Sequence, residues 1–307
     1  MSGFKPADAA LEGFRITREN PKAFAIWVGA SFAVSVLSVL IDTHLPDSVR
    51  HGLESISAND AMTARQFADT LILVSPVLIL GLIIQSIMAA AVYRLIFRHE
   101  DTRFGYLRLG ADELRLMALS VIYIFLIIGL VIGAVAAVGV VVAAFALAGP
   151  TAAALAGTAG VFAVIGIVVY VLVRLSLAPV ATFAERRLAV FESWGLTRGH
   201  FWPLLGAYVL ALACIAVIGF LILMVFSFVA GAVVIASGGQ LTDVKSVIQP
   251  QGNSLRSYLS VGIIAYTLVS SVFSALYNAV IASPGAVAYS GLHGPPPQFT
   301  PAAAKAS

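Results

Sequence analysis

The residues best suited to bind a metal ion lie in one short segment that follows the first apolar run. Imidazole and carboxylate side chains recur there at Asp42, His44, Asp47, His51 and Glu54. Spacings of three and four residues would place the last four on one face of a helix, where they could gather a divalent cation. Apolar residues occupy the opposite face, as in an amphipathic surface helix. Because the spacing matches no strong zinc signature, we favour the surface helix and expect no metal and no cofactor.

A second set of polar residues lies within or beside long apolar runs and could line a path for a solute. Its members are Gln85, Arg94, Arg174, Ser274 and Asn278. The alternative is close helix packing through small and hydrogen-bonding side chains, which Gly129-x-x-x-Gly133 and Ala156-x-x-x-Gly160 also favour. Arg94 and Arg174 would then be anchors that extend to the membrane surface. No charged residue lies inside an apolar run, whereas ion-coupled transporters usually carry one.

A third set consists of arginines interleaved with aromatic residues in basic segments. These are Arg15, Arg18, Arg108, Arg186, Arg187 and Arg198. Such a pattern suits either nucleic acid or anionic lipid head groups, and long apolar runs beside it favour lipid as the partner. Motifs for a phosphate-binding loop, a metalloprotease or a serine nucleophile do not occur, so we expect no enzymatic activity.

The elements that hold these residues are apolar enough to require a membrane. The chain has 307 residues, of which 60% are hydrophobic and only 11% charged, against about 25% charged in a soluble domain. Six runs reach the roughly 20 residues that a helix needs to cross the hydrocarbon core. The predicted spans are about 23–41, 70–93, 116–148, 151–175, 201–236 and 257–283. We predict an all-α, six-span domain over 1–293 and a disordered tail over 294–307.

The distribution of basic residues predicts the orientation of the spans. Fourteen of the 18 Lys and Arg residues precede the first span, follow the last one, or lie in the second and fourth connections. Basic loops stay in the cytoplasm, so this bias places both termini on that side of a bacterial inner membrane. Gly149-Pro150 is the only strong helix breaker between the third and fourth spans, which predicts a tight hairpin.

An internal repeat precedes the odd-numbered spans. The segments 13–20 and 193–200 each contain an aromatic residue, an aliphatic residue two positions later, and then Thr-Arg. The segment 103–115 precedes the third span in the same way with a weaker match. We infer three units, each a basic amphipathic segment at the cytoplasmic interface followed by a helical hairpin. Such repeats are common in transporters but also arise by simple duplication.

One region resembles a known bacterial membrane domain. It contains Arg174-Leu-Ser-Leu-Ala-Pro179, Glu185 and the run Ser193-Trp-Gly-Leu-Thr-Arg-Gly-His-Phe-Trp202. This pattern, over about residues 170–210, resembles the multi-helix membrane domain fused to some glycerophosphodiester phosphodiesterases and also found alone. The resemblance implies a membrane domain without the hydrolase, and hence no phosphodiesterase activity. The expected function is a non-enzymatic protein that engages anionic lipids or organises membrane partners; the alternative is a small-solute or lipid transporter.

Overall fold

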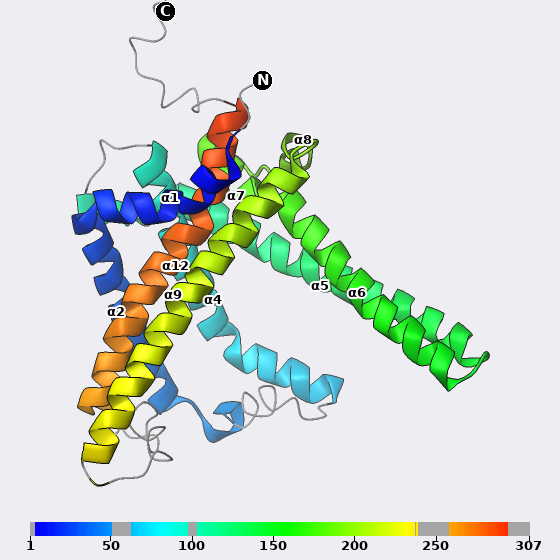
Figure 1. Ribbon diagram of the computed structural model, residues 1–307, viewed down its shortest axis with the longest axis horizontal. Helices are drawn as coiled ribbons and strands as arrows, with labels where there is room; N and C mark the ends of the chain where they lie inside the picture. Colours follow the sequence, from blue (N-terminus) through cyan, green and yellow to red (C-terminus); the bar gives the residue numbers. More distant parts are fainter. Residues whose placement is uncertain (1–3, 51–62, 98–102, 237, 239–257, 294–307) are drawn as a thin grey trace, which may run out of the picture.

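The computed structural model describes residues 4–50, 63–97, 103–236, 238 and 258–293, and within these ranges it contains helices and no strand (Figure 1). The predicted tail 294–307 and the metal candidates His51 and Glu54 lie outside the described residues. The long helices are α2 (Pro21–His44), α4 (Ala64–Phe97), α5 (Ala111–Ala146), α6 (Pro150–Leu175), α9 (Phe201–Ala236) and α12 (Val261–His293). The short elements are α1 (Pro6–Glu19), η1 (Arg103–Tyr106), α7 (Ala178–Glu185) and α8 (Glu192–Leu196).

All six long helices are apolar enough and long enough to cross a membrane, as the sequence predicts. Helix α5 has 36 residues, which at 1.5 Å per residue extend to about 54 Å and exceed the roughly 30 Å hydrocarbon core. The turn between α5 and α6 falls at the predicted breaker: Gly149 has φ 123°, and Pro150 begins α6. Glycine tolerates this backbone angle, and proline at the first helical position loses no hydrogen bond.

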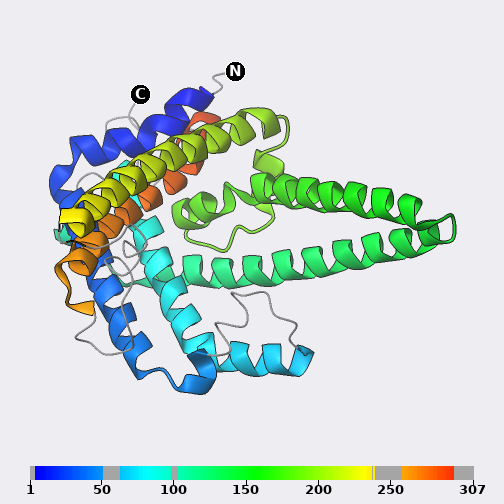
Figure 2. The ribbon, with the colours of Figure 1, turned by 60° about the horizontal axis from the view of Figure 1, so that its bottom comes forward.

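Two helical arms diverge from one end of the molecule. The α5–α6 pair forms one arm and the α9–α12 pair the other (Figures 1 and 2). Helices α2 and α4 both pack against α12. Helix α4 is bent (Figure 2), and it contains Pro76. Proline inside a helix removes a backbone hydrogen bond and its ring collides with the carbonyl four residues earlier, so it commonly bends the helix. The outer parts of both arms expose large apolar side chains such as Phe125 and Phe228.

Helix α1 lies across α12 and α9 at the end where the arms meet (Figure 1). Its buried face contains Gly13, Ile16 and Thr17, whereas Arg15 and Arg18 are exposed. A methyl group added to Gly13 would lie 2.8 Å from the carbonyl oxygen of Ala279 and closer still to Val280. The two helices therefore touch through their backbones, and protein covers the apolar face that the sequence suggested for the membrane interface.

Most of the buried core lies at this same end. Tyr93 on α4, Phe183 on α7 and Tyr289 on α12 belong to one buried apolar cluster, in which alanines make up much of the remainder. The rings of Tyr93 and Phe183 lie 5.6 Å apart, a separation that is favourable for tilted aromatic pairs. The C-terminal parts of α4 and α12 thus converge with α7, which follows α6, and this packing fixes the ends from which the arms diverge.

Candidate functional site

Arg94, near the end of α4, belongs to a buried ion pair and not to the membrane surface. The Arg94 and Glu113 side chains are each only 4% exposed, and an Nη2 of Arg94 donates to the Glu113 carboxylate. The other terminal nitrogen donates to the carbonyl oxygen of Tyr106 at 3.0 Å, and the guanidinium lies 5.9 Å from the centre of the Phe183 ring. The interpretation of Arg94 as a surface anchor is therefore wrong, because Glu113 and η1 enclose it.

Arg174 lies near the end of α6 and is held by the segment that contains α8. Its guanidinium carbon lies 5.3 Å from the Tyr170 ring centre and 5.6 Å from that of Trp194, a geometry typical of cation–π contacts. Nη1 donates to the carbonyl oxygen of Trp194 and to Thr197 Oγ1, both at 3.4 Å. Ser193 Oγ in turn donates to the carbonyl oxygen of Arg174 at 2.7 Å. The Ser-Trp-x-x-Thr pattern thus caps the end of α6, which leaves carbonyls without helical partners.

The basic segment 13–20 also contacts a long helix, because it joins α1 to α12. Gly13 and Thr17 occupy the positions of Ser193 and Thr197 in the repeated pattern, and Gly13 packs against Ala279 and Val280. These residues follow Asn278, which stands where the repeat would place an arginine. Each basic segment therefore contacts an even-numbered long helix: 103–115 near the end of α4 at Arg94, 193–200 near the end of α6 at Arg174, and 13–20 near the middle of α12 beside Asn278. The threefold repeat stays a prediction, because the third contact differs from the other two in its position along the helix.

A cavity of about 710 Å³ lies between α4, α5, α6, α9 and α12. Of the five residues predicted to line a path, Gln85 and Asn278 line this cavity, whereas Arg94, Arg174 and Ser274 do not. The cavity also contains polar residues outside the set predicted to line a path, among them Ser120, Tyr123, Ser176, Tyr208 and Tyr277. Tyr123 and Tyr208 interrupt otherwise apolar runs, and this was the one signal that could have identified them.

Some polar atoms at the cavity have hydrogen-bond partners and others do not. Tyr123 donates from its hydroxyl to the carbonyl oxygen of Leu175 at 2.7 Å, which ties α5 to the end of α6. Asn278 Nδ2 donates to the carbonyl oxygen of Ser274 at 2.8 Å, within its own helix. The other amide atom, Oδ1, is buried and has no hydrogen-bond partner. A buried acceptor without a donor is uncommon and energetically costly, and because Oδ1 has almost no accessible surface, it is not open to the cavity.

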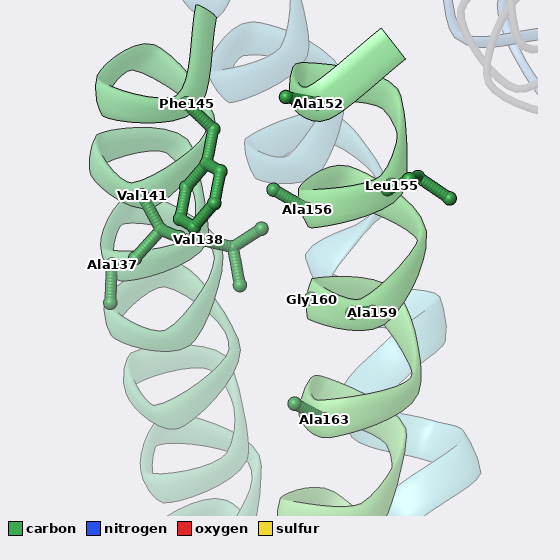
Figure 3. A pocket seen from close by; sticks show the side chains of 10 residues that line it. All are labelled: Ala137, Val138, Val141, Phe145, Ala152, Leu155, Ala156, Ala159, Gly160 and Ala163. Atoms are coloured by element: carbon green, nitrogen blue, oxygen red, sulfur yellow. The ribbon is translucent and has the colours of Figure 1, made fainter. Parts of the chain in front are cut away.

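A second hollow, of about 640 Å³, lies between α5 and α6 far from these groups (Figure 3). Its lining is entirely apolar and includes Val138, Phe145, Ala156 and Gly160. A methyl group added to Gly160 would lie 2.9 Å from a methyl carbon of Val138, so this glycine permits close helix packing, as the sequence predicts. The other predicted pair does not pack in this way, since a methyl group added to Gly129 or Gly133 would meet no atom of another described segment within 4 Å. We assign no chemistry to this hollow.

The six arginines predicted to contact lipid head groups are all exposed. Helices α1, α7 and α8, which carry or border five of them, lie together at the end where the arms meet (Figure 1). Carboxylates lie beside Arg15 and Arg187: Arg15 donates to Glu12 at 2.8 Å, and Arg187 lies 2.6 Å from Glu185 and 2.8 Å from Glu192. Glu12 raises the pKa of Arg15 and Glu185 raises that of Arg187, so both remain cationic at every physiological pH.

The described part of the chain is all-helical, and its six long apolar helices indicate a multi-pass membrane protein. Comparisons with protein-family models, with curated proteins and with solved structures found no match. Its activity must therefore be argued from the arrangement of its own residues.

Proposed function

We propose that this protein is a non-enzymatic component of the bacterial inner membrane that binds anionic lipids through its cytoplasmic end. The observation that carries the proposal is the gathering of exposed arginines on α1 and around α7 and α8. Such residues attract anionic head groups, at about 1 kcal/mol for each basic residue near the surface. In this proposal three consecutive pairs of spans cross the bilayer, both termini are cytoplasmic, and α1 lies at the interface. We also propose that residues 170–210 are related to the membrane domain that is fused to some bacterial glycerophosphodiester phosphodiesterases.

The arginines should not contribute equally. Neighbouring carboxylates already partly neutralise the positive charges of Arg15 and Arg187, so these two attract an anionic lipid head group less strongly. Arg18, Arg186 and Arg198 are exposed and form no ion pair within the part of the chain that the structure describes. We therefore expect these three to provide most of the attraction.

Charge reversal tests this assignment. The triple variant Arg18→Glu, Arg186→Glu and Arg198→Glu should still insert into membranes, but its affinity for phosphatidylglycerol in mixed micelles should fall at least about tenfold. Native mass spectrometry with lipid titration measures that affinity. Arg65→Glu, at the start of α4 and on the opposite side of the predicted membrane, is the matched control and should bind normally. Equal lipid binding by the triple variant and the unmodified protein would reject the proposal.

Transport of a small solute or a lipid is the second candidate, and the cavity that contains Gln85 and Asn278 favours it. Transport requires this cavity to become continuous with the other side of the membrane during a conformational change. Proteoliposomes with a fluorescent phosphatidylcholine in both leaflets test the lipid version. Accelerated quenching of inner-leaflet fluorescence by external dithionite, relative to protein-free liposomes, is the expected result. An unchanged rate rejects lipid transport.

A further inference from the structure

Arg174 carries a positive charge that no carboxylate of the described residues compensates. Arg94, near the end of α4, pairs with Glu113. Arg174, near the end of α6, forms no ion pair within the part of the chain that the structure describes. The last carbonyls of α6 and the carbonyl of Trp194 offer it only partial negative charge. Arg174 therefore remains a net cation beside which an anion can bind.

The guanidinium of Arg174 is held in place with one nitrogen left over for a ligand. Its Nε donates to the Tyr170 hydroxyl at 3.1 Å, and its Nη1 donates to the Trp194 carbonyl and to Thr197 Oγ1. The remaining nitrogen, Nη2, makes no hydrogen bond with a described residue and is not a buried atom. Its N–H groups can donate to an oxygen anion, and the planar guanidinium suits phosphate in particular.

Exposed aromatic side chains lie beside Arg174, as is typical of a membrane interface. Trp194 is 39% exposed and Trp202 is 76% exposed. Tyr170 and Phe201 connect these two rings into one row, in which neighbouring ring centres are 5.3–5.8 Å apart. Tryptophan side chains are enriched at the level of the lipid head groups. The row of rings therefore places Arg174 at the level where the phosphate groups of lipids lie.

The helix surfaces next to Arg174 are apolar and exposed. Leu172 on α6 stands two residues before Arg174, and Val209 and Leu212 on α9 line the same cavity between the two arms (Figure 2). Both helices are apolar enough to cross a membrane. Acyl chains would cover these surfaces, whereas a water-soluble phosphate compound would leave them uncovered. A phospholipid therefore fits this place better than a soluble phosphate does.

We propose that Arg174 binds the phosphate of one phospholipid of the inner leaflet, with Nη2 donating to a phosphate oxygen. The Trp194 and Trp202 rings lie at the level of its head group, and its acyl chains follow α6 and α9 into the bilayer. This site rests on the proposed function, because both place this end of the molecule at the inner leaflet. It differs in requiring a phosphate group and not a net negative head group.

Phosphatidylcholine and diacylglycerol with identical chains test the site, because only the first contains a phosphate and neither has a net charge. Native mass spectrometry from mixed micelles should show one phosphatidylcholine bound at least about tenfold more tightly than diacylglycerol, as expected for a hydrogen bond to a charged group. Equal affinities of the unmodified protein for the two lipids overturn the proposal. A large excess of inorganic phosphate should not displace the lipid. Displacement would assign the site to a soluble phosphate and also overturn the proposal.

Variants assign the contact to Arg174. Arg174→Met should bind phosphatidylcholine and diacylglycerol equally well. Arg115→Met is the matched control, because Asp112 already compensates Arg115, and it should keep the preference for phosphatidylcholine. An unchanged preference in Arg174→Met, or an equal loss of preference in Arg115→Met, overturns the assignment.

Photocrosslinking of the unmodified protein locates the lipid even where Arg174→Met does not fold. A phosphatidylcholine with a diazirine in one acyl chain should label Leu172 and Val209 most strongly, as mapped by mass spectrometry. Labelling spread evenly over the long helices overturns the proposal. Such a failure leaves the anionic-lipid proposal standing, because that proposal depends on phosphatidylglycerol binding by Arg18, Arg186 and Arg198.

Discussion

Removal of one partner of the buried Arg94–Glu113 pair should destabilise the fold severely. Both side chains are 4% exposed, so neither charge can be hydrated once its partner is lost. Breaking such a pair typically costs about 3–5 kcal/mol, because an uncompensated charge stays buried. We expect a cost in this range for Arg94→Met. Glu113→Leu should cost less, since Arg94 keeps the Tyr106 carbonyl and the Phe183 ring as partners.

The double variant Arg94→Met/Glu113→Leu distinguishes this reasoning from a general loss of packing. With both charges gone, the double variant should be more stable than the sum of the single effects predicts, by at least about 2 kcal/mol. Reversible unfolding by sodium dodecyl sulfate in mixed micelles, followed by tryptophan fluorescence, provides the free energies. Asp112→Ala is the matched control: its more exposed pair with Arg115 (2.9 Å) should contribute less than about 1 kcal/mol. Additive single effects would refute the interpretation of a coupled buried pair.

Two further substitutions test how the segments before the odd-numbered spans are attached. Gly13→Leu should detach α1 from α12, because the added side chain would collide with the backbone at Val280; limited proteolysis of α1 measures this. Gly29→Ala, with no atom within 4 Å of the added methyl group, should leave the cleavage pattern unchanged, and equal protection of both variants would contradict the contact. Trp27→Phe removes the 2.7 Å hydrogen bond from the indole to the Gly105 carbonyl and should cost about 1–3 kcal/mol of unfolding free energy. An unchanged unfolding midpoint would argue against that bond.

The sequence was most informative where one physical rule acts along a continuous stretch of chain. Apolar length alone located the six long helices, and Gly149-Pro150 located the turn between α5 and α6. The predicted fifth span, 201–236, coincides with α9, whereas α4 and α5 begin several residues before the predicted spans at 70 and 116. Polar and charged residues can continue a helix beyond the hydrocarbon, so hydropathy underestimates its length.

Such rules could not predict contacts between segments that are far apart in the sequence. Glu113 stands 19 positions from Arg94 and looks like an ordinary surface residue at the start of a helix, so its burial could not be inferred. The apolar face of α1 predicted a membrane surface, yet it packs against α12, since hydropathy does not distinguish lipid from protein as the covering medium. The cavity depends on how far the arms diverge, which the sequence does not determine. Of its lining residues, only Gln85 and Asn278 were among the candidate residues.

The orientation of the arginine-bearing end is tested most directly by labelling single cysteines in intact cells with a membrane-impermeant maleimide. The only native cysteine is Cys214, so Cys214→Ala provides the background for Arg198→Cys beside α8 and for Thr151→Cys at the turn between α5 and α6. We expect Thr151→Cys to react in intact cells and Arg198→Cys to react only after permeabilisation. Reaction of Arg198→Cys in intact cells would place the arginines outside the cytoplasm and contradict the account.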